Sequence, residues 1–207
     1  DTLDGGIGTD TAIFANIDFT ITDTGSAWEI SASGDGTDTV TNVEKLTVGT
    51  DTHLLVGNGG YATIQEAIDA AANGETIHIA AGTYNESLSI SGKSLVLKGY
   101  GDVDVTPSTG NGLDIDGTIS GGLVIEGVDF SGSGTRQFGI DVKVTADVDS
   151  LTIKDSAIEN FTDAGFALDA DKGDSSNPLV SQLTFTGISL TDNGLNPSNS
   201  SFSAGIK

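Results

Sequence analysis

Short apolar segments recur at nearly constant spacing through the second half of the chain. Apolar triplets begin at intervals of 28, 28 and 32 residues, at Leu95, Leu123, Leu151 and Leu183. Glycine-led segments recur at intervals of 27, 26 and 40 residues, at Gly112, Gly139, Gly165 and Gly205. A third series lies at 128–130, 157–158 and 188–190. One strand from each series per repeat, stacked in register, predicts three parallel sheets with inward-pointing apolar ladders.

The segment 61–74 has helical periodicity instead. Its apolar residues recur at i, i + 3, i + 4 and i + 7 and form one stripe, made of Ile64, Ala67, Ile68 and Ala71. Thr63 and Glu66 have the spacing of a capping box, and Asn73-Gly74 supplies a stop signal. We therefore expect one amphipathic helix that ends near Gly74.

Residues 12–48 alternate apolar and polar positions in short runs, separated by glycines at 25, 34 and 36. A period of two with threonine-rich polar positions predicts half-buried strands joined by turns. We expect Trp28 and Tyr84 to pack in the interior rather than to bind sugars. His53 is predicted in a linker, and His78, which alternates with two isoleucines, at an exposed strand position.

Residues 5–13 fit the nonapeptide GGxGxDxUx, where U is a large apolar residue, at every position except Ala12. Asp1 and Leu3 lie nine residues before Asp10 and Ala12, as the tail of a preceding repeat would. The segment resembles the calcium-binding repeats of bacterial RTX proteins, in which the glycine-rich half forms a turn and the other half a short strand. The resemblance implies a Ca²⁺ site, which we assign to Gly5, Gly6, Gly8, Asp10 and Asp1.

Glycines suit such a turn because they reach positive φ, which lets carbonyl oxygens converge, and an aspartate adds a hard anionic oxygen. In the resembling rolls each ion sits between turns on the same side, two nonapeptides apart. The partner turn of 5–10 is therefore expected before residue 1. The segment 35–46 is similar to the strand region that often follows such an array, and it suggests a cap over the end of the roll.

The predicted helix, the segment 75–86 with Gly82-Thr83-Tyr84, and the strands at 88–90 and 95–97 resemble the opening of the pectin lyase-like superfamily. The resemblance implies an all-β fold. It would be a right-handed parallel β-helix with three strands per coil and an N-terminal capping α-helix, preceded by an RTX β-roll remnant and a short strand cap. We expect the remnant and cap at 1–48 and the β-helix at 49–207, truncated at its C-terminal end. The interval of 40 predicts an insertion at 175–178 or 195–203.

Acidic residues outnumber basic ones by 30 to 8, which gives a formal net charge of −22. Nucleic acid and anionic membranes are poor partners for such a chain, whereas divalent cations suit it. There is no cysteine, which excludes disulfides and cysteine-ligated zinc. No apolar run approaches the roughly 20 residues of a membrane span, so we expect no membrane insertion. The RTX resemblance implies secretion or cell-surface display, through type I secretion in a bacterium.

Enzymes that share the β-helix fold provide motifs to compare. The Gln-Asp and Asp-x-Ile-Phe-Gly segments of pectin methylesterases and the Asp-Pro-His-Glu motif of alginate epimerases do not occur. Pectate lyases need a calcium-binding aspartate cluster beside a basic residue. Asp141 with Lys143, and Lys154 with Asp155, have that composition, and Asp169 follows a predicted strand in an acidic turn. Lys143, Lys154, Asp155 and Asp169 are thus the candidate catalytic residues, with surface charge as the alternative for each.

Two functions follow from these patterns. The first is an extracellular calcium-binding repeat module of a larger exported protein, either structural and adhesin-like or able to bind an acidic or neutral polysaccharide. The second is a polysaccharide-active enzyme, a lyase or an epimerase. The absence of a complete catalytic motif favours the first.

Overall fold

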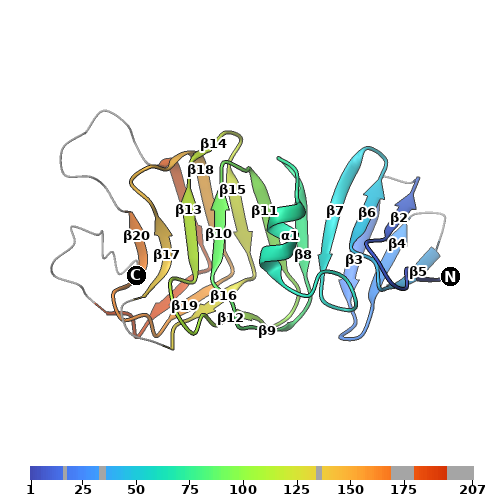
Figure 1. Cartoon of the computed structure of the whole chain (residues 1–207), viewed down its shortest axis with the longest axis horizontal. Helices are drawn as coiled ribbons and strands as arrows, with labels where there is room; N and C mark the ends of the chain where they lie inside the picture. Colours follow the sequence, from blue (N-terminus) through green and yellow to red (C-terminus); the bar gives the residue numbers. More distant parts are fainter. Residues whose placement is uncertain (16–17, 33–35, 134–136, 169–179, 195–207) are drawn as a thin grey trace.

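The computed structural model describes residues 1–15, 18–32, 36–133, 137–168 and 180–194 (Figure 1). Within these residues the chain forms strands, most of them in parallel pairs, and one short helix. The expected all-β class with parallel sheets is confirmed.

The strands form four sheets. The N-terminal sheet has the order β1 (Thr2–Asp4), β5 (Gly36–Thr41), β4 (Trp28–Ala32), β3 (Phe19–Asp23). The long sheet contains β14 (Thr118–Ile119), β18 (Asp147–Lys154), β15 (Leu123–Glu126), β11 (Leu95–Gly99), β8 (Thr76–Ile79), β7 (Asp51–Val56), β6 (Lys45–Val48) and β2 (Thr11–Phe14), with β21 (Val180–Thr186) on β18. The second sheet is β10 (Leu88–Ser91), β13 (Leu113–Asp116), β17 (Phe138–Val142), β20 (Ala164–Leu168). The third is β22 (Ser189–Thr191), β19 (Ala157–Glu159), β16 (Asp129–Ser131), β12 (Val103–Val105), β9 (Gly82–Tyr84).

From β8 onward the chain visits the long, third and second sheets in that order and then begins again. The predicted ladders are in register. In the long sheet, Leu95 pairs with Leu123, Leu123 with Leu151, and Leu151 with Leu183. The other two series form the ladders Leu113–Ile140–Phe166 and Phe130–Ile158–Leu190. Gly205 and both predicted insertion segments lie outside the described residues.

The long, second and third sheets enclose one core of apolar side chains. The helix α1 (Ile64–Ala70) lies beside β8 and β10 (Figure 1). The predicted capping box of Thr63 and Glu66 is confirmed. The helix is shorter than expected and ends at Ala70 rather than near Gly74. Glu75 Oε2 accepts the backbone N–H of Ala72 at 2.8 Å, a side-chain bond that helps the chain turn toward β8.

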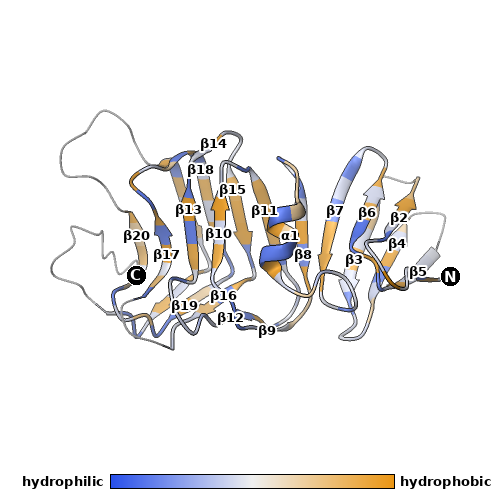
Figure 2. Cartoon of the chain, viewed as in Figure 1, coloured by the Kyte–Doolittle hydropathy of each residue, from blue (hydrophilic) through white to orange (hydrophobic). Residues whose placement is uncertain are grey.

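The long sheet is buried on both faces where the N-terminal sheet covers it. Leu54 and Leu55 are consecutive residues of β7 that point to opposite faces, and both are 0% exposed. Leu54 belongs to the core between the three sheets. Leu55 belongs to a second core that also contains Trp28. Figure 2 shows apolar positions spread along the strands of both regions.

This arrangement corrects two expectations. His53 lies within β7 rather than in a linker. His78 is 6% exposed rather than solvent-facing, because the N-terminal sheet covers the side of β8 that faces away from the main core. Trp28, at 1% exposed, is interior as expected. The domain division at residue 48 stays a prediction, and the hydrogen-bonded long sheet runs across it through β6, β7 and β8.

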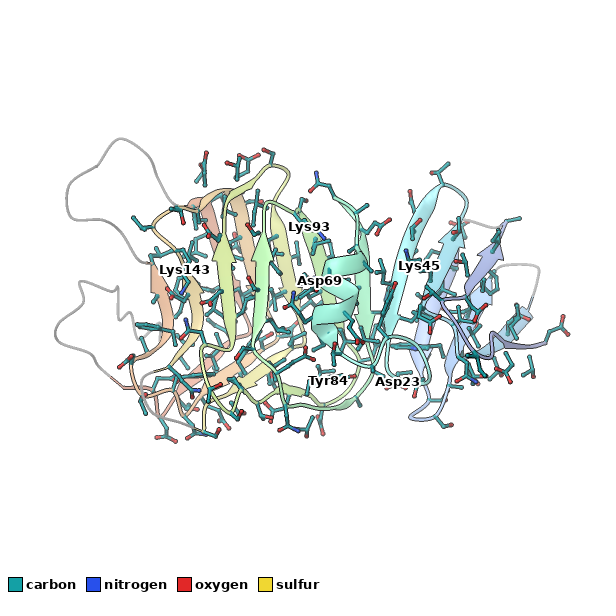
Figure 3. The ribbon with its side chains drawn as sticks, viewed as in Figure 1. Asp23, Lys45, Asp69, Tyr84, Lys93 and Lys143 are labelled. Carbon is teal, nitrogen blue, oxygen red and sulfur yellow. The ribbon has the colours of Figure 1, made fainter. Side chains whose placement is uncertain are left out.

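One aspartate fastens the N-terminal sheet to the long sheet. Asp23, at the end of β3, accepts hydrogen bonds from Asn58 Nδ2 and from the backbone N–H of Ala81, both at 2.8 Å (Figure 3). A third bond comes from the N–H of Gly25 at 2.7 Å. Hydrogen bonds to a charged acceptor are among the stronger ones, so Asp23 links a hairpin to two turns distant in sequence.

Candidate functional site

The glycine-rich turn connects two sheets that face one core. β1 lies in the N-terminal sheet and β2 in the long sheet, and Leu3 and Ala12, the paired U positions of the nonapeptide, pack in the same cluster. The turn at 5–10 stacks on the turn at 42–44. The N–H of Gly5 donates to the Thr41 carbonyl and the N–H of Lys45 donates to the Asp10 carbonyl, both at 3.1 Å.

Asp10 carries the feature of this turn that points most directly to a cation. Its backbone N–H donates to Glu44 Oε2 at 2.7 Å, while its own Oδ2 atom is buried and has no hydrogen-bond partner among the described residues. A buried anionic oxygen without a donor is costly unless a cation or a proton compensates its charge. Gly6 and Gly8, at φ of 85° and 132°, shape the turn around it.

The other predicted calcium ligands are placed differently. Asp1 lies at the opposite end of β1, with its α-amino group 2.8 Å from Asp38 Oδ1. A strand rises about 3.3 Å per residue, so Asp1 and Asp10 do not share one ion. A Cβ on Gly5 would lie 2.0 Å from the carbonyl oxygen of Asn42, which makes Gly5 a packing requirement of the stacked turns.

The donor set of this turn fits Ca²⁺ in chemistry. No three acidic or imidazole side chains gather around one point in the described part of the chain. An ion at 5–10 would therefore be held by Asp10 and backbone carbonyls, which are hard oxygen ligands of the kind Ca²⁺ accepts.

A second cluster surrounds Lys143, just after β17 (Figure 3). Asp114 of β13 and Asp141 of β17 are paired in register, and Lys143 Nζ bonds both carboxylates, at 2.8 Å for Asp114 Oδ1. Asn111 Nδ2 donates to Asp114 Oδ1 at 2.7 Å and to Asp141 Oδ2 at 3.2 Å. One ammonium and one amide thus bind two facing carboxylates, and the ammonium offsets one of their two negative charges.

Asp114 and Asn111 are not among the candidate residues predicted from the sequence. The signal was present in the second series of repeats, because Gly112-Leu113-Asp114 and Gly139-Ile140-Asp141 align residue for residue. Residues at the same repeat position come side by side in a stacked sheet.

The electrostatics make Lys143 a counter-ion. Partial burial lowers the pKa of Lys143, but hydrogen bonds and attraction from Asp114 and Asp141 outweigh it, so the pKa is raised. A general base works best with a pKa near the operating pH. The raised pKa favours the protonated form of Lys143 at neutral pH, and that form is not a base.

The remaining candidates lie elsewhere. Lys154 ends β18 in the long sheet, and its Nζ pairs with Glu126 Oε2 at 2.8 Å. Asp155 occupies a turn with φ of 52°, where its N–H donates to the Thr186 carbonyl at 2.9 Å. Asp169 is outside the described residues. Lys143 thus follows a strand of the second sheet, whereas Lys154 ends a strand of the long sheet, and the two lysines have different acidic partners.

In the described residues no helix is long and apolar enough to cross a membrane. Searches of protein-family models, curated proteins and solved structures found no match to this chain.

Proposed function

We propose that this chain is an extracellular, calcium-stabilised repeat module of a larger exported bacterial protein, with a structural, adhesin-like role. The observation that carries the proposal is the buried Oδ2 atom of Asp10, which lies without a donor in a turn of positive-φ glycines. A bound Ca²⁺ would supply the missing positive charge and would offset part of the net charge of −22.

We further propose that the three sheets form a right-handed parallel β-helix. The repeated order of long, third and second sheets supports this reading, and the right hand is the one that crossovers between parallel strands adopt almost without exception. Such stacks give extended, rigid rods, which suits a spacer or adhesin at a cell surface.

The calcium proposal predicts a rise in melting temperature on adding Ca²⁺. A ligand that binds only the folded state stabilises it by about 2.7 kcal/mol at 100 times its Kd. The chain should be titrated with CaCl₂ and, in parallel, with MgCl₂ at equal ionic strength, so that charge screening is separated from specific binding.

Two variants locate the site. Asp10→Asn should lose most of the calcium-specific rise, because the amide removes the anionic oxygen at the turn. Asp69→Asn removes the same charge from an exposed position on α1 and should keep it (Figure 3). An equal loss in both variants, or no calcium-specific rise in the parent chain, would refute the proposal.

The alternative of a lyase or epimerase rests on the pairing of Lys143 with Asp114 and Asp141. The raised pKa of Lys143 argues against proton abstraction by that residue, which favours the structural role. Incubation with a panel of uronate polymers tests the point. Absorbance from unsaturated ends that disappears in Lys143→Ala would establish a lyase and overturn the structural role.

A further inference from the structure

Three ring side chains form a hydrogen-bonded row where the N-terminal sheet meets the long sheet. His53 Nδ1 lies 3.1 Å from His78 Nε2, and His78 Nδ1 lies 2.9 Å from the hydroxyl of Tyr100. The residues come from β7, from β8 and from the position after β11, which are neighbours in the long sheet (Figure 1). His53 and His78 are the only two histidines in the chain.

The N-terminal sheet covers this row with two aromatic rings. Phe19 of β3 packs edge-on against His53, with ring centroids 5.1 Å apart. Trp28 of β4 packs edge-on against Tyr100 at 5.4 Å. The row therefore lies in the contact between the N-terminal sheet and the long sheet. A change in its geometry would alter the packing of the two sheets.

A count of protons limits what the row can hold. Each of the two hydrogen-bonded gaps has room for one proton. When both histidines are neutral, the bonds can run from Tyr100 through His78 to His53, or in the opposite direction. One added proton also fits, because it can occupy the outer Nε2 of His53. When both imidazoles are cationic, two N–H groups face each other across the 3.1 Å gap, so the hydrogen bond is lost and two like charges meet.

The surrounding charges do not remove this conflict. Asp51 and Glu75 attract a proton to His53, but burial is the larger effect and lowers its pKa. Burial, followed by His53 and Lys98, lowers the pKa of His78 to about 3. Lys98 Nζ also lies over the ring of Tyr100, 5.6 Å from its centroid. Burial and then the negative charge of Glu126 raise the pKa of Tyr100. Acidic side chains thus lie toward both ends of the row, Asp51 and Glu75 at His53 and Glu126 at Tyr100. The cation Lys98 lies at the Tyr100 end.

We propose that the His53–His78–Tyr100 row is an acid-sensitive lock that holds the N-terminal sheet on the long sheet at neutral pH and releases it when both histidines are protonated. In the described part of the chain a continuous apolar core fills the space between the long, second and third sheets, so we expect this stack to stay folded when the lock opens. Release would expose the side of the long sheet that the N-terminal sheet now covers.

The chain carries its own probe for this event. Trp28 is the single tryptophan, it is 1% exposed, and it contacts Tyr100. Its fluorescence should shift to longer wavelength between pH 7.5 and pH 4.5, while the far-ultraviolet circular dichroism of the strands is retained. Calcium-free buffer keeps loss of calcium out of the measurement and separates this test from that of the proposed function.

His78→Gln keeps a donor and an acceptor in the row but cannot be protonated, so its emission should stay unshifted over the same range. His53→Gln replaces the half-buried partner and should behave alike, which preserves the test if the first variant folds poorly. The proposal is overturned by an unshifted parent chain, by equal shifts in the parent and both glutamine variants, or by a shift that coincides with loss of the strand signal.

Discussion

Acid should weaken the folded chain through His78, and the size of the effect follows from its burial. The unfolded chain binds this proton at the ordinary histidine pKa of 6.5, whereas burial lowers the pKa in the folded chain to about 3. Between these values the unfolded state binds more protons, so stability falls as the pH falls. Each unit of pH below 6.5 costs about 1.4 kcal/mol. The free energy of unfolding should therefore drop by about 2 kcal/mol from pH 7 to pH 5 through this residue alone.

The total pH dependence also contains a term of opposite sign. Protonation of carboxylates reduces self-repulsion in a chain with a net charge of −22, which stabilises the fold as the pH falls. A comparison with His78→Gln removes this term, because both chains carry the same acids. Urea titrations at pH 7 and pH 5, followed by circular dichroism, give the two differences. Equal losses of unfolding free energy in the parent chain and in His78→Gln between these pH values would show that His78 is not the source of the acid sensitivity.

Three further predictions can be checked by urea denaturation at pH 7. Gly5→Ala should lower the free energy of unfolding by about 2 kcal/mol or more, because the added Cβ would clash with a backbone carbonyl. Gly6→Ala has open space but φ of 85°, so it should lower the free energy of unfolding by about 1 kcal/mol. Equal losses would contradict the stacking of the two turns. Phe130→Ala, at 0% exposed in the main core, should cost about 3–5 kcal/mol, and a cost below 1 would mean that the core is not packed as described. Lys143→Ala should lower the free energy of unfolding by about 1–3 kcal/mol, because it leaves the Asp141 carboxylate, which is 4% exposed, without its cation. Lys154→Ala should lower it by less than about 1 kcal/mol. The reverse order would refute the charge arrangement.

The register of the stack could be predicted from the sequence because it is a property of spacing alone. Residues one repeat apart, such as Leu95 and Leu123, must come side by side once the strands stack in parallel. Of the two partners of Lys143, only Asp141 was predicted, because the repeat alignment was made on apolar positions and its polar positions were not compared. The nearest acid in sequence, Asp141, accounted for half of the cluster, and Asp114 came from the preceding repeat.

The environment of His78 could not be predicted in this way. Alternation in β8 shows that His78 faces away from two buried isoleucines, and this holds in the structure. Whether that second face meets water depends on which other segment packs there, and β3 and β4 are far away in the sequence. The end of α1 was also not predicted. It depends on Glu75, which lies four residues after Ala71 and whose side chain accepts the N–H of Ala72.

The position of α1 explains why the N-terminal sheet packs on the long sheet and not on the second. Gln65 Oε1 accepts the N–H of Ser89 at 2.8 Å and Gln65 Nε2 donates to its carbonyl at 3.2 Å, so this helix side chain takes the place of a neighbouring strand on β10. Glu86 in turn accepts the N–H groups of Ile64 and Gln65, which fixes the helix at that edge. An edge closed in this way cannot accept another strand. The long sheet instead continues from β8 through β7, β6 and β2, so it offers an extended outer face to the N-terminal sheet. His53 lies on that extension and His78 on the adjacent strand β8. We therefore expect the junction, and not the stack, to be the part of the molecule most sensitive to acid.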